Sequence, residues 1–382
     1  MKCKALFETI DELYPEYLSL WETICNMESP TMDKARVDAV GELFAEMAKE
    51  RCWLVERFES VTGNVVCITM NPEAGAEAIT LSAHMDTVHP VGSFGTPAVR
   101  ADEEKLYGPG VTDCKGGLIV AWLTMNALLR HGFTARPVRF LLQSDEEAGS
   151  RPINKPTIRY MCEKSKGSRA FFNLEGAIRG KACVERKGIL TYTVKVTGIE
   201  AHSSGCAKYG ASAIAEAAHK ILELEKFKDA DGITCTCGVI AGGKTHNTVP
   251  GYCEFRANFR FVNAEEEAYI ASYMQKLAET VYINGCTTVV EEYGSRPAME
   301  RVERNLELLE VINGIFAENG LSALEPVSSP GGSDAAQITS AGIPCLDNFG
   351  VLGGSIHSPN EYAYKASLAE YAKRLAAVIY CI

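Results

Sequence analysis

Several features that define other protein classes are missing from this sequence of 382 residues. It has no run of about 18 apolar residues, so we expect no membrane-spanning helix. It has no internal repeat or low-complexity tract, and we do not interpret its Gly-rich turns as nucleotide sites. The formal net charge of −11 argues against nucleic acid or an anionic membrane as a partner.

The 14 cysteines do not follow the spacing of a disulfide-rich or zinc-binding module. They are scattered, and Cys235 with Cys237 forms a Cys-x-Cys that lacks a second thiol pair at ligand spacing. The first residues also lack the uninterrupted apolar core of a secretion signal. We therefore expect reduced thiols in a cytoplasmic protein.

The composition, with 46% hydrophobic and 23% charged residues, is typical of a globular protein with a large core, and the length suggests two to three domains. Apolar strands alternate with helical patterns over the first 177 residues. This alternation predicts an α/β fold with a mostly parallel sheet and helices on both faces. We expect helices at 5–26, 31–50 and 117–130, and strands at about 53–59, 64–70, 79–83, 138–144 and 170–174.

The order of the predicted elements changes between residues 178 and 292, where it is strand, helix, strand, strand, helix, strand. That order predicts a ferredoxin-like module, inserted as a lid domain between the two parts of the first domain, 1–177 and 293–382. Arg296-Pro297 marks the return to that domain, which closes with helices at about 302–318 and from 365. Within the lid we expect strands at 181–198, 232–241, 249–262 and 287–293, and helices at 211–227 and 264–282.

Polar side chains follow three of the apolar strands of the first domain. The strands end at His84, at Glu146 with Glu147, and at Glu175. Ligands of a parallel sheet bind at the carboxyl ends of its strands, and imidazole with carboxylates suits a metal ion. Each piece also has a structural reading, because His84 could be a hydrogen-bonded core residue and the acids a solvated loop.

Seven motifs, in order and at the right spacing, resemble the co-catalytic zinc hydrolases. That family includes glutamate carboxypeptidases, aminoacylases, acetylornithine deacetylases and succinyl-diaminopimelate desuccinylases. The resemblance runs from about residue 75 to the end of the chain. The motifs are His-Met-Asp-Thr-Val at 84–88, Tyr-Gly-Pro-Gly at 107–110 with Asp113 and Lys-Gly-Gly after it, Asp-Glu-Glu at 145–147, Glu175, Ala-His-Ser at 201–203, Asn-Thr-Val-Pro at 247–250 and His-Ser at 357–358.

The resemblance implies a role for each polar residue of these motifs. His84 and Glu175 would bind a first metal ion, Glu147 and His357 a second, and Asp113 would bridge the two. Asp86 would hold the ring of His84. Glu146 would be the general base, and the division of labour between Glu146 and Glu147 rests on the resemblance alone. Three carboxylates against two divalent ions leave one positive charge, which favours ionisation of a shared water. Nitrogen and oxygen ligands suit two Zn²⁺ ions, with Co²⁺ or Mn²⁺ as substitutes.

The lid carries the residues that the resemblance implies for substrate. His202 would reach the site of a neighbouring subunit and donate to the reaction intermediate, which requires a homodimer formed through the lid; a surface histidine is the alternative. Asn247 and Arg260 would contact a substrate carboxylate, and Arg256 is a rival for Arg260. The turn at 331–333, with Gly332 and Ser333, would offer backbone N–H groups to the substrate.

The expected activity is cleavage of an amide bond in a small peptide or acyl-amino acid, as in the carboxypeptidase-like members. The runner-up is N-acyl amino acid deacylation. Cys114 stands where relatives often carry a second acid, and Glu175 in place of Asp leaves the subclass open. Two alternative functions remain open: a binding protein on a decayed hydrolase fold, and a two-metal phosphoryl-transfer enzyme.

Overall fold

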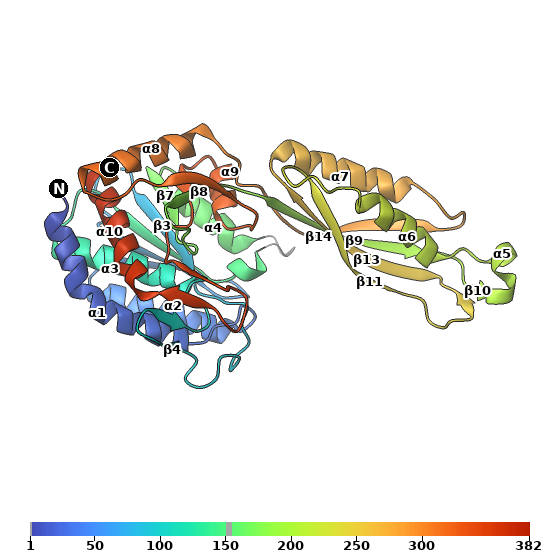
Figure 1. The fold of residues 1–382 in the computed structure, drawn as a ribbon, viewed down its shortest axis with the longest axis horizontal. Helices are drawn as coiled ribbons and strands as arrows, with labels where there is room; N and C mark the ends of the chain where they lie inside the picture. The colour runs from blue at the N-terminus through green and yellow to red at the C-terminus, as the bar shows by residue number, and fades with distance from the viewer. Residues whose placement is uncertain (1, 150–154) are drawn as a thin grey trace.

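The protein forms two lobes, a larger one that carries both chain ends and a smaller one that projects from it (Figure 1). The computed structural model describes residues 2–149 and 155–382. Across these residues, no helix combines the length and the apolar character that crossing a lipid bilayer requires. All 14 cysteines are free thiols.

A six-stranded sheet forms the centre of the larger lobe, in the order β1-β2-β6-β3-β7-β16. Strands β6, β3, β7 and β16 are parallel, whereas β1 and β2 add an antiparallel edge. Strands β2, β3 and β7 are buried along their whole length, as expected of strands covered on both faces. The predicted mostly parallel α/β sheet is confirmed. The strands are β1 (Leu54–Phe58), β2 (Val65–Met70), β3 (Ile79–His84), β6 (Val138–Gln143), β7 (Ala170–Asn173) and β16 (Cys345–Leu346).

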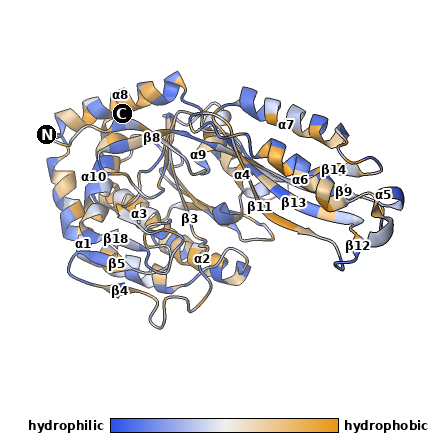
Figure 2. Ribbon diagram, turned by 45° about the vertical axis from the view of Figure 1, so that its right-hand side comes forward, coloured by the Kyte–Doolittle hydropathy of each residue, from blue (hydrophilic) through white to orange (hydrophobic). Residues whose placement is uncertain are grey.

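Helices cover both faces of this sheet, as the side-chain contacts of neighbouring strand residues show. Val66 and Leu142 pack with α1, α2, α3, α8 and α10, while Cys67 and Leu141 pack on the other face with α4 and α9. Figure 2 shows β3 and α3 as largely hydrophobic, consistent with the central position of α3. The helices are α1 (Lys4–Asn26), α2 (Lys34–Glu50), α3 (Lys115–Arg130), α4 (Pro156–Ser165), α8 (Glu303–Glu318), α9 (Ala335–Ser340) and α10 (Lys365–Cys381).

Close packing brings the start of α3 to the carboxyl ends of the parallel strands. A Cβ atom on Gly117 would overlap the carbonyl oxygen of Leu174, directly after β7. Glycine is therefore required for this approach. A small antiparallel sheet, in the order β17-β18-β5-β4, lies beside it and ties the loop before α3 to the loop before α10. Its strands are β4 (Arg100–Ala101), β5 (Lys105–Tyr107), β17 (Gly353–Gly354) and β18 (Tyr362–Tyr364).

The smaller lobe has the element order that the sequence predicts, β9-α6-β11-β13-α7-β14. Its sheet is antiparallel throughout, in the order β11-β13-β9-β14, which is the ferredoxin-like arrangement. A short antiparallel pair, β10 with β12, lies near α5 at the far end of the lobe (Figure 1). The elements are β9 (Gly188–Thr197), β10 (Ala201–His202), α5 (Cys206–Tyr209), α6 (Ala213–Leu224), β11 (Thr234–Gly242), β12 (Thr248–Val249), β13 (Tyr252–Phe261), α7 (Ala264–Glu279) and β14 (Thr287–Arg296).

The strand expected over 181–198 is divided in two at Lys187. Its first part, β8 (Lys181–Arg186), pairs in parallel with β15 (Glu325–Ser329) of the larger lobe, and only β9 joins the lid sheet. Arg186 explains the division, because its Nε lies 2.6 Å from Oδ2 of the buried Asp347. The lid sheet thus spans residues 188–296, while the domain boundaries at 178 and 292 stay a prediction.

Candidate metal centre

Five side chains from separate segments converge at the carboxyl ends of the parallel strands. His84 is the last residue of β3, Glu175 follows β7, and Glu147 lies in a 3₁₀ turn after β6. Asp113 comes from the loop before α3, and His357 from the loop after β17. The predicted ligands are thus brought together from segments more than 270 residues apart, since His84 and His357 both contact Asp113.

The carboxylate of Asp113 lies between the two imidazoles. Its Oδ1 is 2.9 Å from Nε2 of His84, and its Oδ2 is 3.1 Å from Nε2 of His357. Glu147 Oε1 is 3.3 Å from Nε2 of His357 on one side, and Glu175 Oε1 is 3.7 Å from Nε2 of His84 on the other. His84, Asp113 and Glu147 place one ligand atom each within 4.8 Å of one another. A carboxylate with an imidazole on each oxygen has the arrangement that a bridging ligand requires.

Burial and mutual contact shift the pKa values of these groups strongly. Burial raises the pKa of Glu147 to about 7 and holds that of Glu175 well above its ordinary value. The carboxylates of Asp113 and Glu147, both within 3.3 Å of its Nε2, raise the pKa of His357 to about 10. Burial opposes ionisation of Asp113, but hydrogen bonds with His357 and His84 outweigh it and hold its pKa below the usual range. Clustered shifts of this kind are typical of functional sites.

The donor set fits divalent metal ions. Three carboxylates and two imidazoles are hard or borderline ligands that suit Zn²⁺, Co²⁺ or Mn²⁺. Oε1 of Glu147 is buried and receives no properly oriented hydrogen bond from any residue in the described ranges, although Nε2 of His357 is within ion-pair distance. A buried carboxylate oxygen of this kind has lone pairs available to a cation.

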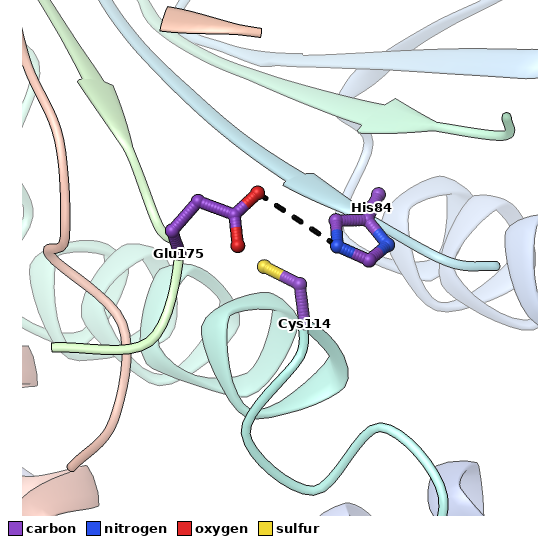
Figure 3. Close-up of side chains that lie close together, drawn as sticks. All are labelled: His84, Cys114 and Glu175. Atoms are coloured by element: carbon purple, nitrogen blue, oxygen red, sulfur yellow. Dashed lines mark ion pairs between the residues drawn. The ribbon is translucent and has the colours of Figure 1, made fainter. Parts of the chain in front are cut away.

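A thiol borders the same space. Figure 3 shows Glu175 and His84 facing each other, with the side chain of Cys114 beside them. The three offer ligand atoms within 4.8 Å of one another. The thiol of Cys114 donates a hydrogen bond to the carbonyl oxygen of Leu174 at 3.0 Å, and burial holds its pKa well above the ordinary value. The peptide bond between Asp113 and Cys114 is cis.

Asp86 contacts His84 and also supports the acids after β6. Nδ1 of His84 lies 2.9 Å from the carbonyl oxygen of Asp86 and 3.3 Å from its Oδ1. The backbone N–H groups of Glu146 and Glu147 donate to the Asp86 carboxylate, each at 3.2 Å, and the hydroxyl of Thr31 donates to it at 2.8 Å. One buried carboxylate therefore orients both an imidazole and the backbone of two acids.

Glu146, the predicted base, is held by an arginine that the sequence interpretation treats only as a boundary marker. Arg296, the last residue of β14, donates from NH1 to Oε1 of Glu146 and from NH2 to its carbonyl oxygen at 2.9 Å. Both side chains are buried. Nothing local in the sequence indicates that Arg296 has Glu146 as its partner.

A cleft of about 600 Å³ opens above the cluster, lined by residues of both lobes. Arg260 and Gly332 line it, as the resemblance implies, and so does Arg296. Ser333 is completely buried instead, and its hydroxyl donates to Asp347 at 2.5 Å.

Two of the predicted substrate contacts lie elsewhere in the lid. His202 ends β10 at the far end of the lid, and the carbonyl oxygen of Asn247 accepts a hydrogen bond from the neighbouring Ser203 N–H at 2.9 Å (Figure 1). The structure does not bring His202 or Asn247 into the cleft of the same chain. Their roles at the site stay predictions.

Comparison with known proteins gives a consistent result. Residues 80–380 match the family described as Peptidase family M20/M25/M40. Carboxypeptidase G2 of Pseudomonas sp. (strain RS-16) is 25% identical over 360 residues, which cover 92% of this chain and 86% of that protein. Acetylornithine deacetylase of Myxococcus xanthus is 27% identical over 230 residues, which cover 56% of this chain and 58% of that protein.

Solved structures show the same fold. A tripeptidase from Staphylococcus aureus superposes with a TM-score of 0.79 at 21% identity, over 95% of this chain and 96% of that one. An M20 family metallo-carboxypeptidase from Sulfolobus solfataricus superposes with a TM-score of 0.72 at 16% identity, over 95% and 98%. Because the family match spans well over half of the sequence, the chain belongs to peptidase family M20/M25/M40.

Proposed function

We propose that the protein is a dinuclear metal-dependent hydrolase that cleaves the amide bond of a small peptide or acyl-amino acid. The observation that carries the proposal is the Asp113 carboxylate held between His84 and His357 at the base of a cleft. His84 and Glu175 would hold one ion, Glu147 and His357 the other, and Asp113 would be shared between them. We propose two Zn²⁺ ions, with Co²⁺ or Mn²⁺ as substitutes.

Bound ions of this kind polarise a scissile carbonyl and lower the pKa of water to about 7. The remaining chemistry belongs to Glu146, which takes the proton of the attacking water and passes it to the leaving amine. Arg296 fixes the position of Glu146 next to Glu147, so that the base faces the cleft rather than the lobe interior.

Arg260 binds a carboxylate of the substrate in this proposal. It lies on β13, lines the cleft, and makes no side-chain hydrogen bond or ion pair within residues 2–149 and 155–382. Burial lowers its pKa, so desolvation favours the arrival of an anion as partner. A guanidinium grips a carboxylate with two parallel hydrogen bonds. A substrate with a free carboxylate next to the scissile amide therefore suits the cleft.

A carboxypeptidase-like activity is our first choice, because the similarity to carboxypeptidase G2 extends over 92% of the chain. The second candidate is deacylation of N-acyl amino acids, as in acetylornithine deacetylase, for which the similarity covers 56%. The non-enzyme alternative is a binding protein on a decayed hydrolase fold. The complete set of five ligands and a base supports the enzyme over this alternative.

We further propose a cytoplasmic homodimer formed through the lid. Strand β11 is the edge of the lid sheet, and its Val239 and Ile240 are more than half exposed, as is Leu222 on α6. An exposed apolar edge strand is a template for pairing with a second copy. In that dimer His202 would contact substrate in the partner's cleft.

The base is tested by Glu146→Ala, with Glu163→Ala on the exposed face of α4 as the matched control. The first variant should keep both metal ions and lose about 10²- to 10⁴-fold in turnover, the usual contribution of a general base. The control should match wild type. Short peptides are screened against N-acetyl and N-succinyl amino acids, with and without chelator. Undiminished turnover by Glu146→Ala, or activity indifferent to chelator, contradicts the proposal.

A further inference from the structure

A buried carboxylate outside the predicted ligand set lies directly behind Asp113. Glu361 is completely inaccessible to solvent, and its two oxygens accept from four donors. Oε1 accepts from the backbone N–H groups of Thr112 at 2.9 Å and of Asp113 at 3.0 Å. Oε2 accepts from the N–H of Gly110 at 3.2 Å and lies 2.9 Å from Nε2 of the buried His89. The acceptor sites of an ionised carboxylate are thereby filled.

Glu361 joins two loops that are far apart in sequence. One is the loop 108–113, which delivers Asp113 to the cluster and leads into α3. The other is the loop 355–361, which carries His357. Further contacts between these segments are the Thr112 hydroxyl, which donates to the Tyr362 carbonyl at 2.7 Å, and the antiparallel pairing of β5 with β18.

The two sides of the cluster are supported differently. On one side, His84 and Glu175 follow directly from β3 and β7, whose backbones are fixed by the central sheet. On the other side, Asp113 and His357 come from loops, and the Glu361 carboxylate holds the backbone of Asp113 itself. A ligand on a loop keeps its geometry only if contacts beyond the ligand shell hold it in place.

We propose that Glu361, with His89 as its side-chain partner, is the positioning residue for Asp113 and thereby sets the second ion site, between Asp113, Glu147 and His357. This inference rests on the proposed dinuclear site. Replacing the carboxylate with an amide of the same shape turns one of its two oxygens into an N–H donor, which then faces either the Gly110 N–H or the N–H groups of Thr112 and Asp113. The loop 108–113 must then move, and Asp113 loses its position between the two imidazoles.

The experiment titrates metal-free wild type and Glu361→Gln with Co²⁺, following visible absorption and calorimetric heat for each equivalent. Loss of a partner beyond the ligand shell costs about 10- to 100-fold in metal affinity. We expect that loss at the second equivalent, while the first changes by less than about tenfold because two of its three ligands, His84 and Glu175, are held by sheet strands. The visible spectrum of the second Co²⁺ should change as well.

Thr112→Val is the matched control, because it removes another contact between the same two loops and leaves the Glu361 carboxylate untouched. Thermal unfolding of the metal-free proteins measures how much each variant loosens the loops. If Glu361 only stabilises the two loops and does not position Asp113, both variants should lower the unfolding temperature and bind the second Co²⁺ with equal affinity. Equal second-site affinity in the two variants overturns the inference.

His89→Leu keeps the experiment decisive if Glu361→Gln fails to fold. It removes one of four donors and leaves the three backbone contacts, so we expect a loss of about three- to tenfold at the second equivalent. Wild-type affinity in that variant counts against the inference. Failure of the proposed function has a separate signature, because wild type itself would then bind no second equivalent.

Discussion

Metal binding to this site should release protons, in a number that the geometry sets. In the metal-free protein, His357 faces the carboxylates of Asp113 and Glu147, and its pKa rises to about 10. Burial opposes protonation of His84, but hydrogen bonds with Asp113 and Asp86 outweigh it and hold the pKa of His84 well above its ordinary value. Both imidazoles are therefore protonated at pH 7. A metal ion binds only the neutral ring, so each must lose its proton.

The expected count follows from these pKa values. The two imidazoles contribute about two protons at pH 7. Glu147, with a pKa of about 7, contributes about half a proton more, and Glu175 adds to it because burial holds its pKa well above the usual range. A metal-bound water with a pKa of about 7 releases about half a proton more, so the count should lie between about two and four at pH 7.

Calorimetric titration with Zn²⁺ in buffers of different ionisation enthalpy measures this number, since the slope of heat against buffer enthalpy is the number of protons released. His357→Gln is the informative variant, because its side chain carries no titratable proton, and its count should be lower by about one. Release of fewer than about one proton by wild type at pH 7 would show that the imidazoles are neutral before metal binds, and would refute the reasoning.

Two further predictions concern pH and substrate. The raised pKa of His357 stabilises the metal-free protein below its unfolded pKa of 6.5, and this contribution is lost as pH rises toward about 10. Since the ring is half exposed, the loss is about 1 kcal/mol or less, seen as a falling unfolding temperature that the metal-loaded protein should not share. Arg260→Lys keeps the charge but loses the fork that grips a carboxylate, so KM for carboxylate substrates should rise about 10- to 100-fold at similar kcat. An equal rise in KM for the carboxamide analogue would contradict this role.

The fold was predictable because its signals are local. Apolar runs such as 79–83 and 138–144 are bounded by turn residues, and they appear as β3 and β6 within one residue. The order of elements in the lid was enough for the ferredoxin-like module, because few topologies suit that order. The break at Lys187 was not predicted, since only one residue separates β8 from β9 and Arg186 selects a partner 161 residues away.

The site residues that were predicted also have local sequence signals, whereas those that were missed depend on contacts far along the chain. His84, Glu147 and Glu175 each follow an apolar strand, so the periodicity places them at one edge of the sheet. Arg296 and Glu361 have no such marker. Their functions lie in contacts with Glu146, 150 residues earlier, and with the loop 108–113, 248 to 251 residues earlier.

The chain passes between the two lobes twice, near Arg186 and near Arg296, and each arginine pairs with a buried carboxylate. Only the second of these carboxylates belongs to the predicted base. At the first connection, Arg186 pairs with Asp347, a buried carboxylate that also accepts from Asn173 and Ser333 and so belongs to the scaffold. At the second, Arg296 pairs with Glu146 by two contacts, one to the side chain and one to the backbone. Because Arg296 is part of the lid strand β14, the lid is tied to the base directly. A rotation of the lid about its second connection therefore has to carry Glu146 with it or break a buried ion pair, whereas the buried pair at the first connection involves no predicted metal ligand.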